Sequence, residues 1–362
     1  MTTRHLFMTI VRSSAAAMVV LLTFAACDRQ QVVAPEQTIS EQRAHAGPAS
    51  ISNAQVVEVI ARHDDDGIDY VFDLSDDVIP AGWTTFELDN HSSSTHFVFL
   101  ARVPDGAVRG AAEAGDDVEL LDYWIESVTH PFQAVMDDII ASEDNPFVHF
   151  GEIPGWFGDV VPMGGPGFTQ GHLSSRTTVY LEPGHYVLEC YVKDAEGKFH
   201  SYTGMISLLE VDGDMPSRTS EPRATFDVVV SSGNGIEAAE EMRPGLHSIR
   251  VHFADQNAYG HGLGHDLHLI RLNGTDVEDV ARWMNWMAPT GLESSSRDRG
   301  PQTFIGGVQT MKAGSVGYMT VKLTPGDYAW ISEVPHPDED PTNATPMWQT
   351  FTVPFGTAAG GP

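Results

Sequence analysis

The chain has 362 residues, of which 41% are hydrophobic. This length exceeds what one core usually organises, so two domains are expected. Fifty acidic residues stand against 20 basic ones, which gives a formal net charge of −30 at pH 7. Such a surface repels nucleic acid and anionic lipid headgroups and argues against both as partners; it suits either the steering of a cationic redox partner or solubility in salty surroundings.

The N-terminus predicts an exported protein. Arg4 and Arg12 form a positively charged region ahead of a short apolar run at 15–22. This run is too short to span a bilayer, so residues 1–26 are predicted to be a signal peptide. The small residues before Cys27 resemble the lipobox of bacterial lipoproteins, and this resemblance implies that Cys27 carries a lipid. The alternative is an ordinary cleaved signal with a chance cysteine. We therefore expect a cell-envelope protein, periplasmic or otherwise extracytoplasmic, that is lipid-anchored to a membrane.

Composition then divides the rest of the chain. Residues 27–50 are polar and without periodicity, which predicts a flexible tether. From Val56 onward, short β-type runs alternate with Pro-Gly and Ala-Gly turns, which predicts an all-β protein. The expected order is a first domain at 51–211 with a helical and loop insert at about 107–168, a linker at 212–223, a second domain at 224–354 and a tail at 355–362.

The two domains are predicted to be copies of one another. At a shift of 142 residues, Gly164–Met205 matches Gly306–Met347 without a gap. At a shift of 169, His96–Arg102 matches His265–Arg271, so the first copy is longer between these two blocks. This self-similarity predicts a tandem duplication of one β domain.

The extra length of the first copy has a pattern of its own. Residues 118–125 and 131–140 predict two helical pieces, and the Gly-, Pro- and Phe-rich stretch 145–168 predicts an irregular loop. This insert is either a lid over the first domain's site or a packed surface excursion. In the second copy, Thr275–Glu278 is a capping box that opens a short helix.

Cys190 is the residue most suggestive of chemistry. The chain has two cysteines, and if Cys27 is lipidated, Cys190 has no disulfide partner in an oxidising compartment. Its thiol is then either a metal ligand or an inert buried group. Cys190, His200 and Met205 follow one another with the spacing C-x9-H-x4-M. With one upstream histidine, these are the ligand types of a blue-copper electron-transfer site.

The order of these residues resembles the cupredoxin family. A His-containing strand from His96, a Gly-Gly segment, a Pro-Gly-x-Tyr turn and then Cys190, His200 and Met205 follow that family's pattern, and much of the framework occurs twice. The resemblance implies two tandem Greek-key β-sandwiches and one type 1 copper in the first, held by these four residues. The long Cys-to-His loop is similar to the copper nitrite reductase branch. Phe97 replaces the family's usual Asn, which predicts weaker hydrogen bonding near the thiolate.

The second copy lacks half of this ligand set. His265 and Met347 remain, but Ser332 replaces the cysteine and Thr342 the second histidine, so the second domain is expected to be structural or degenerate. The histidines of the stretch 261–268 are expected to be solvated, with His265 and His268 on opposite faces of a strand. The acidic runs 64–66 and 338–340 are expected to be solvated loops.

Two functional classes fit these observations. The first is a lipid-anchored copper-binding protein that exchanges single electrons with a redox partner protein in the cell envelope. The alternative is a metal-free cupredoxin-like binding or scaffold lipoprotein. The sequence holds no Gly-x-Ser-x-Gly, phosphate-loop or His-Glu-x-x-His motif, so acyl or phosphoryl transfer has no support. A copper oxidoreductase is less favoured, because Glu189 and Tyr191 flank Cys190 where the catalytic branches place a histidine.

Overall fold

The computed structural model describes residues 53–63, 70–142, 146–256, 264–293, 300–336 and 344–355. The predicted signal peptide, Cys27 and the tether lie outside these residues, as do both acidic runs, His261, Thr342 and nearly all of the tail. Within the described ranges, no helix combines the length and the apolar character needed to cross a membrane. The described residues all belong to one compact unit, and the domain boundaries stay a prediction.

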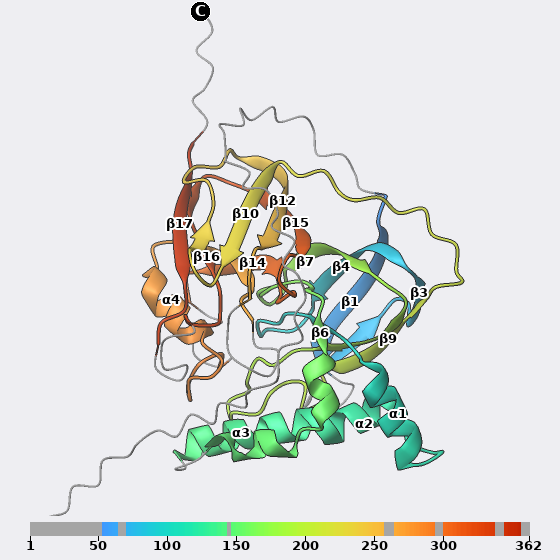
Figure 1. Ribbon diagram of the computed structural model, residues 1–362. Helices are drawn as coiled ribbons and strands as arrows, with labels where there is room; N and C mark the ends of the chain where they lie inside the picture. The colour runs from blue at the N-terminus through green and yellow to red at the C-terminus, as the bar shows by residue number, and fades with distance from the viewer. Residues whose placement is uncertain are drawn as a thin grey trace, which may run out of the picture. The chain divides into compact units, whose positions relative to one another are not determined.

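Seventeen strands occur in the described residues (Figure 1). Those of the first repeat are β1 (Gln55–His63), β2 (Tyr70–Leu74), β3 (Val78–Pro80), β4 (Gly82–Asn90), β5 (Phe99–Arg102), β6 (Val161–Pro162), β7 (Ser174–Leu181), β8 (Gly184–Glu189) and β9 (Ile206–Asp212). Those of the second are β10 (Phe226–Ser231), β11 (Gly235–Glu237), β12 (Gly245–Phe253), β13 (Leu267–Arg271), β14 (Thr303–Val308), β15 (Val316–Leu323), β16 (Gly326–Ile331) and β17 (Trp348–Val353).

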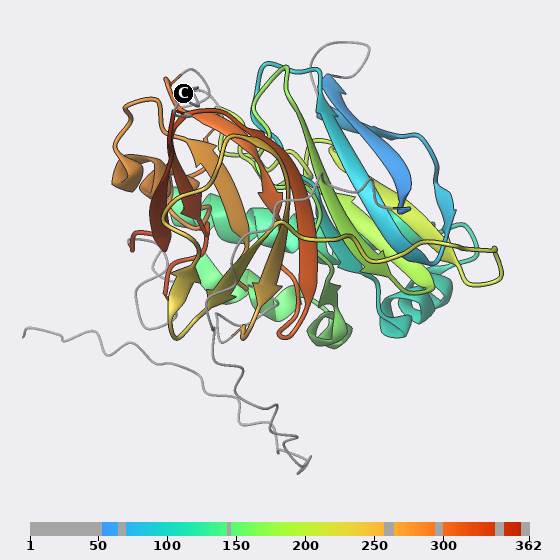
Figure 2. The ribbon, with the colours of Figure 1, turned by 90° about the horizontal axis from the view of Figure 1, so that it is seen from above.

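The strands form three sheets. An eight-stranded sheet has the order β11-β10-β12-β15-β7-β4-β1-β2, and Figure 2 shows its blue-to-green strands beside its yellow-to-red ones. A five-stranded sheet, β3-β9-β8-β5-β6, belongs to the first repeat, and a four-stranded sheet, β14-β13-β16-β17, to the second. Side chains of all three sheets meet in one hydrophobic core. The predicted fold class, two tandem Greek-key cupredoxin-like β-sandwiches with short helical insertions, is confirmed.

Alternating burial along the strands explains why each sheet has one inward face. In β4, every second residue is buried, including Thr84, Phe86 and Leu88, while the residues between them are partly exposed. In β1, Val57, Val59 and Ala61 are buried in the same way. Successive strand residues point to opposite faces, so this pattern turns one apolar row from each strand toward the sandwich interior.

The duplication is reproduced strand by strand. β7 and β15, and likewise β8 and β16, have bounds that differ by the offset of 142 found in the sequence. β1 pairs with β4 in parallel, as β10 does with β12. The two halves meet along β7 and β15, where Thr177 pairs with Met319, its own counterpart. Pro166 and Val308, also counterparts, form an isolated bridge. The repeats are therefore related by a local twofold axis.

The Gly-Gly segment near this axis shows why glycine is required. Gly165 and Gly307 are counterparts, and both have positive φ, at 118° and 156°. A Cβ added to either would collide with a backbone carbonyl oxygen, that of Val98 or of Leu267. Both copies thus need glycine for the same close approach between backbone segments.

The insert covers the outer face of the five-stranded sheet. It holds α1 (Asp105–Ala114), α2 (Leu120–Trp124), the π-helix η1 (Ile125–Thr129), α3 (His130–Ala141) and the 3-10 helices η2 (Pro146–Glu152) and η3 (Gly155–Asp159). Trp124 and Val128 pack with Ala101 and Val187 of the sheet in a small second core. In Figure 1 the helices α1, α2 and α3 lie together on one side of the first repeat.

This insert differs from the sequence expectation in three ways. Helix α1 was not expected, the two expected pieces run on from one another through η1, and short 3-10 helices occupy part of the stretch expected to be an irregular loop. In the second repeat, the expected helix α4 spans Val277–Met284, but its N-cap is Asp276, whose carboxylate accepts a hydrogen bond from the Glu278 N–H. Asp takes this role as readily as Thr.

Candidate metal centre

Cys190 follows β8 directly, and strand alternation decides where it points. Leu188 and Cys190 belong to the main core, whereas Glu189 and Tyr191 line a pocket on the opposite side of the sheet. Cys190 is fully buried. The side chains flanking the thiol therefore face away from it, as the period of a strand requires.

His96 is brought to Cys190 by the segment just before β5. Its backbone forms two hydrogen bonds with Thr169, at 3.1 and 2.7 Å, which hold this segment against the Gly-Gly region. The imidazole of His96 is fully buried. Since β5 pairs with β8, residues next to these two strands meet at the same end of the sheet.

His200 returns to Cys190 because the intervening loop folds back on itself. Lys193 and Phe199 form an antiparallel bridge, and Gly197, at φ 81°, makes the turn between them. The His200 N–H donates to the Val192 carbonyl at 2.8 Å, and the Ser201 N–H donates to the Cys190 carbonyl at 2.7 Å. A nine-residue spacer thus brings its two ends together.

The three side chains present their ligand atoms to one point. Cys190 Sγ lies 3.8 Å from His96 Nδ1 and 3.9 Å from His200 Nδ1, and the two nitrogens are 3.1 Å apart. A point equidistant from the three atoms lies about 2.1 Å from each, close to the ~2.0–2.3 Å of metal–nitrogen and metal–sulfur bonds in proteins. These buried residues therefore fit a metal ion. One thiol and two imidazoles suit a soft transition metal.

Ser92 fixes the tautomer of His96. Its hydroxyl lies 2.7 Å from His96 Nε2, 2.9 Å from Asn90 Oδ1 and 3.2 Å from the Ser94 carbonyl. The oxygens of Asn90 and Ser94 can accept the hydroxyl proton, so the hydroxyl accepts the Nε2–H of His96. His96 Nδ1 then turns a free lone pair toward Cys190, as metal ligation requires.

The tautomer of His200 decides whether it can bind a metal. Its Nε2 is buried and has no hydrogen-bond partner in the described part of the chain, so it is unsatisfied in either tautomer. A proton on Nδ1 would be donated to His96 Nδ1, 3.1 Å away, whereas a proton on Nε2 would leave the Nδ1 lone pair for a metal.

Met205 is fully buried and is tied to the same loop through its backbone. The Met205 N–H donates to the His200 carbonyl at 2.8 Å, and the Cys190 N–H donates to the Met205 carbonyl at 3.2 Å. The structure thus brings the side chains of His96, Cys190 and His200 together. The backbone of Met205 is hydrogen-bonded to that of Cys190 and of His200. The role of the four as metal ligands stays a prediction.

Burial decides the protonation of the metal-free group. Burial lowers the pKa of His200 to about 3 and, together with the charge of His200, lowers that of His96 well below its usual range. Burial raises the pKa of the Cys190 thiol to about 12, although the backbone N–H groups of Phe97 and Val192 donate to it and lower the pKa in part. Backbone donation thus supplies hydrogen bonds that the replacement of Asn by Phe97 was expected to weaken.

Three neighbours of the group were missed from the sequence. The ring of Tyr70 lies with its centroid 4.2 Å from that of His200, 4.8 Å from that of His96 and 4.3 Å from that of His63. Ser92 is the third. Tyr70 and His63 come from β2 and β1, more than a hundred residues before His200, and no spacing marks them. The Ser-x3-His spacing of Ser92 and His96 is a signal that could have been used.

The equivalent place in the second repeat keeps the geometry without the thiol. His265 Nδ1 lies 3.2 Å from Ser332 Oγ. The Ser332 N–H donates to the Met347 carbonyl at 3.0 Å, as the Cys190 N–H does to Met205. A hydroxyl here makes a hydrogen bond where the first repeat has a thiol. The framework is therefore common to both repeats, and the thiol distinguishes the first.

The expectation that His265 and His268 are solvated is wrong, since both are fully buried. The Phe168 N–H donates to His268 Nδ1 at 3.0 Å, so His268 carries its proton on Nε2 and donates it to Asp266, 2.9 Å away. Although Asp266, His268 and Glu333 cluster closely enough to suggest a metal site, this tautomer leaves His268 without a lone pair to offer. The cluster is a hydrogen-bonded network.

No protein-family model and no curated protein matches the chain. Among solved structures, it is similar to auracyanin A, a "blue" copper protein from Chloroflexus aurantiacus, with 14% identity, 43% of this chain and 98% of that chain covered, and a TM-score of 0.24. It is also similar to a blue copper oxidase from Nitrosomonas europaea (11% identity, 83% and 86% covered, TM-score 0.21) and a copper nitrite reductase from Nitrosomonas europaea (11%, 83% and 93%, TM-score 0.19).

Proposed function

We propose that the first repeat would bind one copper ion through His96, Cys190, His200 and Met205, and that the protein carries single electrons. The observation that carries this proposal is the convergence of two Nδ1 atoms and one Sγ on a point about 2.1 Å from each. Copper at this place would supply a one-electron redox couple.

The chain's own residues would do the rest. The Cys190 thiol gives up its proton when it becomes a ligand, and the N–H groups of Phe97 and Val192 stabilise the resulting negative charge. Ser92 holds His96 in the tautomer that ligation needs. Full burial of the three side chains excludes water from the group.

A carrier is favoured over a copper oxidoreductase. Glu189 and Tyr191 flank the thiol, so neither neighbour offers the imidazole through which the catalytic branches connect the thiolate to a second metal. We place the protein in the cell envelope, anchored through Cys27, where its strongly negative surface would attract a cationic redox partner.

Addition of Cu(II) to the purified protein tests this proposal. We expect an intense visible thiolate-to-copper charge-transfer band at a stoichiometry of one. Cys190→Ser should abolish the band, whereas His265→Gln, at the matching position of the second repeat, should leave it unchanged. Cys27→Ser should also leave it, which assigns the band to one thiol. A colourless wild type with weak binding of undefined stoichiometry would favour the metal-free scaffold instead.

A further inference from the structure

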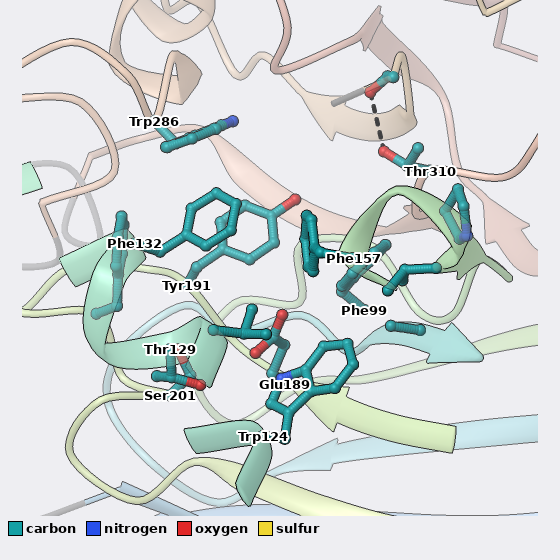
Figure 3. Close-up of a pocket in the computed structure, with 16 residues that line it drawn as sticks. Phe99, Trp124, Thr129, Phe132, Phe157, Glu189, Tyr191, Ser201, Trp286 and Thr310 are labelled. Atoms are coloured by element: carbon teal, nitrogen blue, oxygen red, sulfur yellow. Dashed lines mark hydrogen bonds between the residues drawn. The ribbon is translucent and has the colours of Figure 1, made fainter. Parts of the chain in front are cut away.

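A pocket lies behind the metal group, on the outer face of the five-stranded sheet. It has a volume of about 90 Å³ and sixteen lining residues (Figure 3). β5 and β8 form one wall, the insert helices form a second, and Trp286 and Thr310 of the second repeat contribute a third. The pocket is therefore built from three parts of the chain that are distant in sequence.

The lining is aromatic and carries one carboxylate. Among the described residues that line it, seven are Phe, Tyr or Trp, and none is Lys, Arg or His. Glu189 is the one acidic residue among them, and Figure 3 shows its carboxylate between the Trp124 indole and the rings of Phe132 and Tyr191. Among the described residues, no cationic side chain forms an ion pair with it. An ionised carboxylate among aromatic rings without a cation is costly, and burial accordingly raises the pKa of Glu189 to about 7.

A π-helix brings an unpaired hydroxyl to the same pocket. In η1, the His130 N–H donates to the Ile125 carbonyl, five residues back, and Pro131 follows without an N–H of its own. This wider turn ends at Val128 and Thr129, which both line the pocket. Thr129 is 3% exposed, and its hydroxyl has no hydrogen-bond partner in the described residues. Such wide turns frequently occur at functional sites.

We propose that this pocket binds a small organic ammonium ion. Its charge would be compensated by the Glu189 carboxylate, and its alkyl groups would contact ring faces, which attract cations through their quadrupole. An ammonium N–H can also donate to the Thr129 hydroxyl. The absence of lining cations disfavours an anionic ligand, and the net charge of −30 raises the local concentration of cations. The inference holds with or without copper.

The test uses two ligands of one shape that differ in charge, tert-butylammonium and tert-butanol. Their affinities for the full-length protein are measured by calorimetry and by tryptophan fluorescence, to which Trp124 and Trp286 of the pocket contribute. We expect the cation to bind at least about tenfold more tightly than the alcohol, and Glu189→Gln to remove this preference. Glu210→Gln, which removes one exposed charge from β9 of the same sheet, should leave it unchanged.

Thr129→Val provides a second, nearly isosteric variant. It should weaken the cation severalfold while leaving tert-butanol within about twofold. Thermal unfolding of each variant confirms that it is folded before its affinity is compared. Equal affinities for the two ligands, undetectable binding of the cation to the wild type, or an equal loss in Glu189→Gln and Glu210→Gln would each overturn the proposal.

Discussion

The hydroxyl of Tyr191 donates a 2.6 Å hydrogen bond to Glu333, which occupies the same position, 142 residues on, in the other repeat. The two residues that follow the thiol and its serine replacement thus meet at the interface between repeats. Glu333 also receives support from Asp266, which accepts its backbone N–H at 2.8 Å. The metal group of the first repeat is therefore one residue away from a buried polar contact with the second.

The Tyr191–Glu333 contact should contribute measurably to stability. Tyr191→Phe removes the donor and leaves the buried Glu333 carboxyl without it, so we expect the free energy of unfolding to fall by about 1–3 kcal/mol. Denaturant unfolding measures this. Tyr202→Phe, at an exposed tyrosine, is the control and should change it by less than about 0.5 kcal/mol. An equal effect in both variants would contradict an energetic role for the contact.

Ser92 should act on the metal through His96. In Ser92→Ala the Nε2–H of His96 loses its acceptor, and we expect copper affinity to fall by about 10- to 100-fold, as when comparable supporting groups are removed. Competition with a chelator of known affinity measures this loss. The adjacent Ser93 is exposed, so Ser93→Ala should keep wild-type affinity. Unchanged affinity in Ser92→Ala would show that packing alone orients the imidazole.

A thiol alone should not restore the second repeat. Ser332→Cys places sulfur beside His265, but Thr342 stands where the first repeat has its second histidine. We expect the variant to keep a single copper and an unaltered visible band. Metal analysis and the band's intensity provide the readout. The double variant Ser332→Cys with Thr342→His, which supplies both missing ligand types, is compared with the single variant. A second blue site in the single variant would mean that another side chain supplies the missing ligand.

Lys193 should make stability depend on pH. Burial lowers its pKa from 10.5 to about 7, although the charge of Glu293 raises it. Between these values the unfolded chain binds the proton that the folded chain has released. The stability of the wild type relative to Lys193→Met should therefore be constant below pH 7 and rise above it, by at most about 1.4 kcal/mol per pH unit.

Denaturant unfolding of both proteins at pH 6, 7, 8 and 9 gives this difference directly. The Lys193 ammonium donates to the carbonyls of Trp286 and Ala288, at 3.1 and 2.8 Å, which ties the loop after Cys190 to the second repeat. A pH-independent difference would show that these carbonyls hold the amine charged throughout the range.

Cys27 should determine membrane association. If it is acylated, Cys27→Ser moves the protein from the membrane fraction to the soluble fraction, because the lipid anchor is lost. Fractionation followed by immunoblotting measures this. Cys190→Ser is the matched control and should stay with the membranes. A wild type found wholly in the soluble fraction would favour the ordinary cleaved signal.

The sequence predicted the repeated framework well, because an ungapped match of that length fixes strand bounds as well as fold. β7 and β15 have equal lengths at the offset found in the sequence. It also predicted that His96, Cys190 and His200 lie in one site, because the Cys-to-His spacing and the strand that follows His96 match the cupredoxin pattern. The fate of His268 could not be predicted in this way. Its burial depends on Phe168 and Asp266, one of which lies a hundred residues away.

Contacts across the repeat axis could not be predicted either. An offset of 142 shows that Tyr191 and Glu333 are equivalent, but equivalence does not tell which surface of each repeat faces the other. The pocket could not be predicted for the same reason, because one of its lining residues, Trp286, comes from the surface of the second repeat that faces the first. Helix α1 was not predicted, because its buried residues, Ala107 and Ala111, are too small to mark an apolar face in the sequence.

The pairing of β7 with β15 gives the second repeat, which lacks the thiol, a structural role. If the two repeats were separated at the linker, the long strand β7 of the first repeat would have an uncovered edge. The free N–H and C=O groups of such an edge can pair with strands of other molecules. In the intact protein, three residue pairs between β7 and β15 cover the middle of both edges at once. Each repeat therefore protects the other from edge-to-edge aggregation, and this protection does not depend on whether either repeat binds a metal.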